Sequence, residues 1–565
     1  MSPSRDESLL IARAKAWHDQ DPDDTTRAEL ATLIRAAETG DAQGVVELGR
    51  RFDTRLEFGT AGLRGELGAG SNRMNRVLVA QAAAGFAAYL LEKQATAAPD
   101  VAPSIVIGYD GRQNSDVFAR DTAQIMAGAG VRAVLLPRML PTPVLAFAVR
   151  LLDVSAGVMV TASHNPARDN GYKVYLGGYD HGSQIVAPAD AEIAAHITRV
   201  ALEQNVLELP RSDDFEIAGD NVVDEYVRRT AELGRSSSAP VKVVYTAMHG
   251  VGWEVAQRVI AAAGFAEPTV VAEQITPDPA FPTVAFPNPE EPGALDLAFA
   301  TATEAGADLI IANDPDADRL AIAVPDAFGG WRRLSGNDVG SLLGWRAAER
   351  IAGSDARGTL AASIVSSPAL STIAGEYHLD YVETLTGFKW ISRAGGLAYG
   401  YEEALGYLVD PEKVRDKDGI SAAVDFLSLV SELAERGLTL ADHETAFAEK
   451  FGAFASSQIS LRVDDLDDIQ RLMARLRDAP PAALGSIGVV QIDDFANGFG
   501  QFPPGDILRF VLDDDARAIV RPSGTEPKLK VYIDATSREG TATERRTAAD
   551  AVVAELDAAM RELLG

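Results

Sequence analysis

Short runs of hydrophobic residues alternate along most of the chain with segments whose hydrophobic positions recur at helical spacing. Runs typical of buried strands occur at 104–112 (which ends in a turn), 131–136, 156–160, 241–246, 308–312 and 360–365. The intervening sequence favours helices at 77–91, 117–128, 189–207 and 254–263. Because strands that alternate with helices form parallel sheets with right-handed crossovers, this pattern predicts α/β domains.

The two ends of the chain follow different patterns. Residues 8–51 have hydrophobic positions at helical spacing, which indicates N-terminal helices. From about residue 449 a strand, a helix at 466–476, two or three strands and a C-terminal helix from about 543 follow one another, which favours an antiparallel sheet. We therefore predict an α/β fold of three consecutive mixed or parallel sheet domains plus a C-terminal α+β domain, at 1–210, 211–325, 326–448 and 449–565.

Composition narrows the class of protein. The chain has 565 residues, too many for one hydrophobic core, and 47% of them are hydrophobic. The formal net charge is −30, and no cluster of Lys and Arg suited to nucleic acid or anionic lipid is found. Cysteine is absent, which excludes disulfides and cysteine-ligated zinc. No secretory signal is visible, and the longest apolar segment, 77–91, is too short to span a bilayer, so we expect a cytoplasmic protein without nucleic-acid or membrane partners.

A polar motif, TASHNP at 161–166, follows the predicted strand at 156–160. Asn-Pro favours a turn, so Ser163 should lie on a tight loop at the carboxyl end of the strand, where open α/β sheets bind ligands. A serine beside a histidine in a rigid turn is a candidate nucleophile or phosphoryl carrier. The alternative is a polar turn with capping side chains, which this motif by itself does not exclude.

Three carboxylates follow the buried strand at 308–312. Asp314, Asp316 and Asp318 alternate, and in extended backbone alternate side chains share a face. Unneutralised, the three groups would repel one another, and a hard divalent cation such as Mg²⁺ resolves this. A solvated acidic loop is the alternative, but the preceding strand and the following Arg319 favour a metal.

Two further motifs suit a phosphorylated sugar. Glu402 and Glu403 lie in a glycine-flanked loop, where adjacent carboxylates can accept hydrogen bonds from sugar hydroxyls, although such a pair is usually solvated surface. The C-terminal motif offers two cations, two hydroxyls and a glycine within eight residues, which favours an anion cradle over an ordinary hairpin turn. Its members are Arg521, Ser523, Gly524, Thr525 and Lys528.

These motifs resemble, in order, the four signature loops of the α-D-phosphohexomutases, the phosphoglucomutase/phosphomannomutase superfamily. The matching segments are 161–166, 314–319, Glu403 with Gly406, and 521–528. The resemblance covers nearly the whole chain. The segments 17–27, 58–64, 386–390 and 402–407 resemble the long branch of that family, which holds phosphoglucomutase-2/phosphopentomutase-like enzymes and bacterial proteins called phosphomannomutase B.

The resemblance implies four domains around a central cleft: a phosphoserine-loop domain, a metal-binding domain, a sugar-binding domain and a phosphate-binding domain. Phosphate would reside on Ser163, and one Mg²⁺ per chain would be held by the three aspartates and an oxygen of the phosphate on Ser163. The phosphoserine would phosphorylate a hexose 1- or 6-phosphate, and the bisphosphate would reorient and return its other phosphate. A sugar 1,6-bisphosphate would act as primer. The oligomeric state is left open between a monomer and a homodimer.

The resemblance assigns roles to further residues. Arg64, His164 and Lys173 would flank the reacting phosphate, and Arg319 would belong to the catalytic centre. Lys173 and Lys389 are the candidates for moving protons. Substrate binding would fall to Gly387, Glu402, Glu403, Arg521, Ser523, Gly524, Thr525 and Lys528.

The sugar loop departs from the pattern of many family members, which read Gly-Glu-x-Ser-Gly-His. Here Ala404, Leu405, Gly406 and Tyr407 follow Glu403. The departure removes a serine hydroxyl and a histidine that usually face the sugar. It therefore bears on substrate choice, and glucose, mannose and pentose phosphates all stay open.

Three other functions compete with a mutase. A catalytically silent sugar-phosphate-binding protein would lack Ser163 or one metal aspartate, and all four are present. A metal-dependent phosphatase would carry Asp-x-Asp-Gly-Thr, which is absent. A serine hydrolase is disfavoured because neighbouring Ser163 and His164 cannot easily face each other, and because no Gly-x-Ser-x-Gly elbow occurs.

Overall fold

The chain divides into two compact units. The computed structural model describes residues 5–59, 62–97, 100–237, 239–354, 357–463, 466–523 and 528–565. The first unit comprises Met1–Ser236, Pro240–Arg333 and Asp410–Ser428, and the second comprises Ser237–Ala239, Leu334–Val409 and Leu429–Gly565. Among the described residues, each unit contains two β-sheets.

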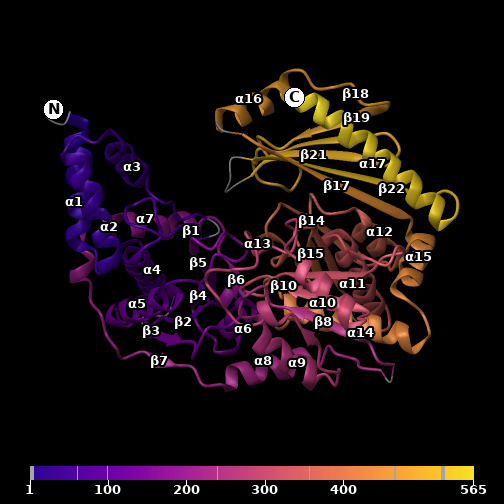
Figure 1. Ribbon diagram of the computed structural model, residues 1–565, viewed down its shortest axis with the longest axis horizontal. Helices are drawn as coiled ribbons and strands as arrows, with labels where there is room; N and C mark the ends of the chain where they lie inside the picture. Colours follow the sequence, from indigo (N-terminus) through magenta and orange to yellow (C-terminus); the bar gives the residue numbers. More distant parts are fainter. Residues whose placement is uncertain are drawn as a thin grey trace. The chain divides into compact units, whose positions relative to one another are not determined.

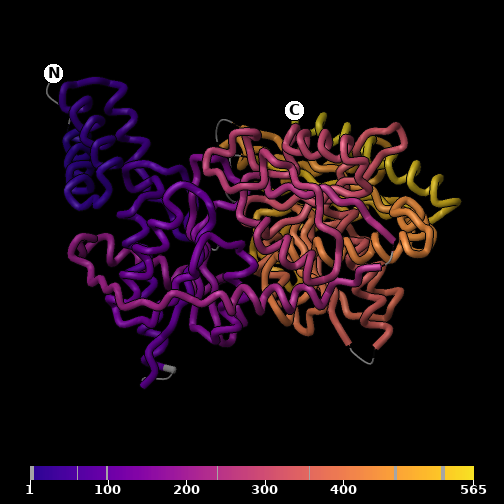
Figure 2. The backbone as a smooth tube through the Cα atoms, turned by 60° about the horizontal axis from the view of Figure 1, so that its bottom comes forward, coloured from indigo at the N-terminus to yellow at the C-terminus, as the bar shows by residue number. Residues whose placement is uncertain are grey.

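Three helices precede the first sheet: α1 (Arg5–Gln20), α2 (Asp24–Glu38) and α3 (Ala42–Phe52). They stand together at the N-terminal end of the first unit (Figure 1, Figure 2). Leu10, Leu30 and Leu48 share one core. Asp23 and Asp41 cap α2 and α3 by accepting hydrogen bonds from backbone N–H groups of the first turn. The helical pattern at 8–51 thus forms three helices separated by aspartate-capped turns.

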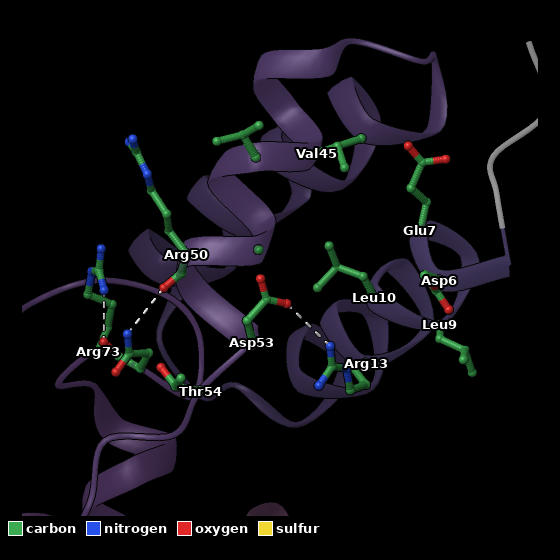
Figure 3. Close-up of a pocket in the computed structure, with 13 residues that line it drawn as sticks. Asp6, Glu7, Leu9, Leu10, Arg13, Val45, Arg50, Asp53, Thr54 and Arg73 are labelled. Atoms are coloured by element: carbon green, nitrogen blue, oxygen red, sulfur yellow. Dashed lines mark hydrogen bonds and ion pairs between the residues drawn. The ribbon is translucent and has the colours of Figure 1, made fainter. Parts of the chain in front are cut away.

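A hollow of about 1160 Å³ lies between α1 and α3 (Figure 3). Leu10 and Val45 belong to its apolar lining. Arg13 and Asp53, also in the lining, form an ion pair with 3.7 Å between Nη2 and Oδ1. None of the residues predicted for the site lines this hollow, so the two are different places.

The first sheet of the first unit is mixed. Its elements are β1 (Leu63–Glu66), α4 (Arg76–Ala97), β2 (Ser104–Tyr109), α5 (Ser115–Gly128), β3 (Arg132–Leu135), α6 (Thr142–Leu151), β4 (Ala156–Val160), β5 (Asp169–Leu176), η1 (Gly178–Asp180), β6 (Ser183–Gln184), α7 (Ala189–Glu203), η2 (Val206–Glu208) and β7 (Glu216–Ile217). The strand order is β1-β5-β4-β2-β3-β7, with β6 on β5. β2 pairs in parallel with β3 and β4, and β5 is antiparallel to β1 and β4. One core packs the sheet against α4, α5 and α7.

The second sheet of the first unit is smaller. Its elements are α8 (Asn221–Ala231), β8 (Val243–Thr246), α9 (Gly252–Ala262), β9 (Thr269–Val270), η3 (Ala272–Gln274), α10 (Asp296–Ala305), β10 (Leu309–Asn313), β11 (Leu320–Pro325) and β12 (Trp331–Arg333). The strand order is β12-β11-β10-β8-β9, with β10 parallel to β8 and antiparallel to β11. Every residue of β10 is buried, which explains why its sequence is an unbroken apolar run up to Asn313.

The second unit begins with a four-stranded sheet. Its elements are α11 (Gly336–Ala352), β13 (Thr359–Ser363), α12 (Ala369–Glu376), β14 (Asp380–Thr384), α13 (Phe388–Ile391), β15 (Leu397–Glu402), β16 (Gly406–Leu408) and α15 (Leu440–Phe451). The helix α14 (Gly419–Glu435) belongs to the first unit up to Ser428 and to the second unit from Leu429. β13 is parallel to β14 and β15, and β16 returns antiparallel to β15. Capping boxes fix the first turns of α11 and α15.

An antiparallel sheet ends the second unit. Its elements are β17 (Ala453–Arg462), α16 (Leu466–Asp478), β18 (Ala483–Leu484), β19 (Ile487–Asp494), β20 (Leu508–Leu512), β21 (Arg517–Pro522), β22 (Lys528–Ser537) and α17 (Ala542–Leu564). The strand order is β17-β22-β21-β20-β19-β18, and every pairing is antiparallel. α17 packs along this sheet against β17 and β22 (Figure 1).

The predicted fold class is confirmed: three mixed α/β sheets precede an antiparallel α+β sheet. The first sheet includes β7, which follows the expected boundary at residue 210, and residues 410–428 group with the first unit. The four domain boundaries stay a prediction. Among the described residues, no helix combines the length and the apolar composition that crossing a membrane requires.

Candidate active site

Ser163 lies on the loop that follows β4, as the sequence predicts. Its backbone has a left-handed φ of 52°, which is uncommon for a residue other than glycine. The Ser163 N–H donates to Thr161 Oγ1 at 2.8 Å, so the loop supplies its own capping bond. Ser163 is 3% exposed, which places its hydroxyl inside the protein instead of on a solvated turn.

The three aspartates lie on a turn after β10. The expectation that they alternate along extended backbone is wrong, because Ala317 has a φ of 53° and its N–H donates to the Asp314 carbonyl at 2.8 Å. The turn nevertheless brings the carboxylates together: one oxygen from each of Asp314, Asp316 and Asp318 lies within 4.8 Å of the others. All three residues are buried. Their convergence, predicted from spacing, is produced by a turn.

The serine loop and the aspartate turn meet. Ser163 Oγ donates to Asp314 Oδ2 at 2.9 Å, across 151 positions of sequence. Ser163 Oγ also lies 3.1 Å from His164 Nδ1, so the expectation that these neighbours cannot face each other is wrong. The left-handed backbone at Ser163 changes the direction of its side chain relative to the next residue. Burial, together with Arg319 and Arg64, holds the pKa of His164 well below its usual value, which favours a neutral imidazole.

Lys173 on β5 contacts two of the carboxylates. Its Nζ donates to Asp316 Oδ2 at 2.7 Å and to Asp318 Oδ2 at 2.9 Å. Burial lowers the pKa of this amine, but the two aspartates outweigh burial and raise it overall. Burial by itself would raise the pKa of the Asp318 carboxyl. Lys173 and other nearby cations outweigh burial, so the pKa of Asp318 is lowered overall. The protein therefore holds a charged amine against charged carboxylates.

Two predicted arginines also lie near this centre. Arg64 on β1 donates from Nη1 to Asn165 Oδ1 at 3.1 Å, which ties β1 to the serine loop. Burial lowers the pKa of Arg64, with Asp316 acting against it. Arg319 donates its backbone N–H to Asp314 Oδ1 at 3.0 Å. The structure therefore brings Arg64, His164, Lys173 and Arg319 to Ser163 and the three aspartates.

Lys417 belongs to the same cluster and was not singled out from the sequence. Its Nζ lies 3.4 Å from Asp318 Oδ2 and 3.4 Å from Asp416 Oδ1, and Lys417 is 7% exposed. Asp416 accepts a hydrogen bond from the buried hydroxyl of Tyr175 on β5. The available signal was the run Asp-Lys-Asp-Gly at 416–419, in which charged residues stand directly before an apolar helix.

The predicted sugar residues lie in the second unit. Glu402 ends β15, and Glu403 Oε2 accepts hydrogen bonds from the hydroxyls of Ser363 and Ser366, each at 3.1 Å. Gly387 precedes α13 with a φ of 108°, a conformation that favours glycine. Lys389 on α13 places its Nζ 5.7 Å from the ring centre of Trp390.

Three of the predicted phosphate residues, Arg521, Ser523 and Lys528, lie where β21 ends and β22 begins. Arg521 pairs with Lys530 in the strand register, and the Ser523 N–H donates to the Lys528 carbonyl at 2.7 Å. Gly524 and Thr525 lie outside the described residues. Arg521, Ser523 and Lys528 therefore lie at one end of the antiparallel pair of β21 and β22.

Comparison with known proteins decides which family has this combination of elements. Models of the phosphoglucomutase/phosphomannomutase α/β/α domains I, II and III match residues 55–204, 224–329 and 335–451, and the C-terminal domain model matches 459–551. The chain belongs to the phosphoglucomutase/phosphomannomutase family. The family models begin after α3, so the three N-terminal helices precede the matched region of the family fold.

Individual relatives of this family span most of the chain. A Haemophilus influenzae protein named "Probable phosphomannomutase" is 57% identical over 87% of this chain and 98% of its own length. The human protein named phosphopentomutase is 35% identical over 86% of each chain. A solved Burkholderia thailandensis phosphoglucomutase/phosphomannomutase family protein has a TM-score of 0.67 at 21% identity, covering 90% of this chain and 97% of its own, which shows a shared fold.

The aspartate cluster of this family member fits a cation. Asp316 Oδ1 and Asp318 Oδ1 are buried and have no hydrogen-bond partner among the residues that the structure describes. Burial and the two neighbouring carboxylates raise the pKa of Asp314 well above its usual value, because three negative charges crowd one buried space. A hard divalent cation would relieve that crowding and could take these two oxygens as ligands. The three aspartates could therefore hold a metal ion.

Proposed function

We propose that the protein is a phosphohexomutase, which interconverts hexose 1-phosphate and hexose 6-phosphate of glucose, mannose or both. The observation that carries the proposal is the 2.9 Å hydrogen bond from Ser163 Oγ to Asp314 Oδ2, beside two further buried aspartates. A hydroxyl held against a cluster of acidic oxygen ligands suits a phosphoryl carrier, because a cation held by those oxygens would neutralise the charge of a phosphate carried on the serine.

In the proposed reaction, phosphate on Ser163 passes to the free hydroxyl of the bound hexose phosphate. The hydroxyl oxygen forms a bond to phosphorus as the bond between phosphorus and Ser163 Oγ breaks, and the hydroxyl proton leaves to a base. The bisphosphorylated sugar then reorients, and its other phosphate returns to Ser163. Phosphoryl transfer of this kind asks mainly for alignment and charge neutralisation, and Arg64, Lys173 and Arg319 supply positive charge near Ser163.

The proton carrier in this scheme is one of three groups. Lys173 and Lys389 follow from the family resemblance, and His164 gains support from its 3.1 Å contact with Ser163 Oγ. The imidazole that burial keeps neutral has a ring nitrogen that can accept a proton, and its lowered pKa makes it a weak base. Lys173 instead has a raised pKa and two carboxylate partners, which favours a role in holding charge.

We assign the metal to Mg²⁺, held by Asp314, Asp316 and Asp318 with an oxygen of the phosphate on Ser163. Mg²⁺ would neutralise charge on the phosphoryl group in transit. Hexose 1,6-bisphosphate would serve as the primer that keeps Ser163 phosphorylated. Substrate binding would fall to the second unit, with Gly387, Glu402 and Glu403 at the sugar hydroxyls and Arg521, Ser523 and Lys528 at the non-reacting phosphate. Gly524 and Thr525 are proposed with them from the sequence.

The substrate is tested by measuring kcat/KM for the 1-phosphates of glucose, mannose and ribose side by side, with Mg²⁺ and glucose 1,6-bisphosphate present. The proposal expects a hexose phosphate to have the highest value and chelation to abolish turnover reversibly. A preference for ribose 1-phosphate would make the protein a phosphopentomutase, the alternative supported by the human relative. Binding without turnover, or release of free phosphate without isomerised sugar, would overturn the mutase proposal.

A further inference from the structure

Arg112 makes an unusual set of contacts with the loop that carries Ser163. It stands in the turn after β2 and is 4% exposed. Its Nη2 donates to the carbonyls of Ser163 and Asn165, each at 2.6 Å. Its Nη1 donates to the carbonyls of Pro166 and Asp169, at 2.8 and 3.0 Å. One guanidinium therefore binds four carbonyl oxygens of a single seven-residue stretch, 163–169.

The guanidinium is itself fixed on two sides. Asp110 Oδ2 lies 3.5 Å from Arg112 Nε, and Asp110 Oδ1 accepts hydrogen bonds from the hydroxyl of Ser115 and from the Arg112 N–H. The ring of Phe281 covers the guanidinium, with 4.9 Å between Arg112 Cζ and the ring centre. Phe281 is 3% exposed and comes from the connection before α10, so a distant segment covers this contact.

The loop has few bonds of its own to hold its shape. The backbone bonds are Asn165 N–H to the Ala162 carbonyl, Asp169 N–H to the Pro166 carbonyl and, from the residue that follows β1, Leu67 N–H to the Arg168 carbonyl. One side-chain bond within the loop joins the Asn165 amide to Asp169 Oδ2, at 2.9 Å. Ser163 also carries a left-handed φ, which a free loop would tend to relax. A planar guanidinium presents two donors on each terminal nitrogen in a rigid fork, so it can bind four oxygens at once. A lysine ammonium has the same charge but only one nitrogen.

We propose that Arg112 is a positioning residue, which holds the Ser163 loop in the conformation that directs Oγ at Asp314, and that Phe281 keeps the guanidinium in place. The action is geometric: among the described residues, the Arg112 side chain makes hydrogen bonds to backbone carbonyls and an ion pair with Asp110, and none to the Ser163 hydroxyl or the three aspartates. The kinetic part of this inference rests on the proposed mutase function, whereas the structural part does not.

The structural part is tested by amide hydrogen exchange in Arg112→Lys, in which charge is kept and the fork is lost. The matched control is Arg51→Lys, because Arg51 is a part-buried guanidinium that donates to the Ala69 carbonyl at 3.1 Å and does not contact the serine loop. We expect faster exchange in peptides covering 161–170 in Arg112→Lys and unchanged exchange there in Arg51→Lys. Unchanged exchange at 161–170 in Arg112→Lys would overturn the proposal.

The kinetic part uses single-turnover phosphorylation of Ser163 by glucose 1,6-bisphosphate, followed by mass spectrometry, together with steady-state turnover. A misplacement of about 1 Å can cost roughly 100-fold in rate, so we expect kcat and the phosphorylation rate to fall about 100-fold in Arg112→Lys. KM should stay within about threefold, because the substrate groups assigned above are untouched. Full activity in Arg112→Lys would show that charge suffices and would overturn the geometric role.

A milder variant keeps the test decisive if Arg112→Lys does not fold. Phe281→Leu leaves the four carbonyl bonds but removes the ring that covers the guanidinium. We expect it to raise exchange at 161–170 and to lower kcat about fivefold, with KM unchanged. Lowered stability with wild-type exchange and wild-type kcat would contradict the proposal. Failure of the wild-type protein to turn over any phosphosugar would instead refute the proposed function, and the exchange result would still stand.

Discussion

The predicted reacting groups and the predicted binding groups differ in how deeply the chain buries them. In the first unit Ser163 is 3% exposed, Asp314 and Asp316 are 0% exposed and Asp318 is 1% exposed. In the second unit Glu402, Glu403, Lys389 and Arg521 are half-buried. The first group is joined by direct hydrogen bonds and ion pairs, whereas the Glu403 carboxylate accepts side-chain hydrogen bonds from the described residues through Oε2.

This difference in burial suits separate roles for the two groups, phosphoryl transfer for the first and sugar recognition for the second. Phosphoryl transfer gains from groups that are aligned before the substrate arrives, because they need no rearrangement in the transition state. Sugar recognition gains from groups that a ligand can still engage and desolvate. Four predictions probe this contrast, from the largest expected effect to the smallest.

Ser163→Ala should lower turnover by on the order of 10⁴- to 10⁶-fold, because it removes the proposed phosphoryl carrier. Steady-state assays with glucose 1-phosphate and mannose 1-phosphate measure the loss. Ser155→Ala is the matched control, since Ser155 precedes β4, whereas Ser163 follows it, and its hydroxyl accepts a hydrogen bond from the Ser104 N–H. Turnover retained in Ser163→Ala would show that Ser163 is not the phosphoryl carrier, and that the chemistry does not depend on the buried group in the first unit.

Asp316→Asn should lower kcat roughly 10³-fold and weaken Mg²⁺ binding, because one anionic ligand becomes neutral. Calorimetric titration with Mg²⁺ and turnover at rising Mg²⁺ measure the two effects, and excess metal should restore part of the activity. Asp308→Asn serves as control, since Asp308 precedes β10 and its Oδ2 accepts a hydrogen bond from the Lys242 N–H at 2.8 Å. An unchanged Mg²⁺ affinity in Asp316→Asn would contradict a metal at this cluster.

Glu403→Gln should act on binding in the second unit. A hydrogen bond to a charged group is worth about 1.5–3 kcal/mol, so kcat/KM should fall roughly 10- to 100-fold, mostly through KM. The control is Glu412→Gln, whose side chain is 78% exposed. A fall in kcat with KM unchanged would place Glu403 in the chemistry and break the proposed division between the two units.

The smallest effect concerns the stability of the second unit. His443 stacks on Trp345 with 4.3 Å between ring centres, and burial, aided by Arg436 and Arg346, lowers the pKa of His443 to about 4. Below pH 6.5 the unfolded chain takes up a proton that the folded chain takes up only near pH 4. The free energy of unfolding should therefore fall as the pH drops through that window, by about 1 kcal/mol at pH 5 after allowance for solvent screening.

The measurement compares unfolding of the wild type and of His443→Phe at pH 7 and pH 5. Phenylalanine keeps a ring on Trp345 and cannot titrate. Between pH 7 and pH 5, the free energy of unfolding of the variant should therefore fall by about 1 kcal/mol less than that of the wild type. Turnover should be the same in both proteins. A pH dependence of stability identical in the two would show that His443 does not titrate between the folded and unfolded states.

The sequence by itself determined the order of strands and helices and the positions of the four motifs. In buried strands such as β4 and β10 every side chain is excluded from water, so the sequence of each strand is a continuous apolar run. Such runs can be recognised without a structure. The convergence of the three aspartates was likewise predictable, since their charge and spacing call for a cation. Residues whose chemistry depends on their own type, such as Ser163, were found this way.

Tertiary structure alone decided which distant groups meet. The left-handed backbone at Ser163 and at Ala317 sets the directions of Ser163, His164 and the aspartates, and no local pattern at those positions announces it. Lys417 contacts Asp318 from 99 positions away, and Arg112 contacts the Ser163 carbonyl from 51 positions away. Spacing along a chain reports local geometry, whereas contacts between loops depend on how whole sheets pack. The contacts of Lys417 and Arg112 therefore became visible only in the tertiary structure.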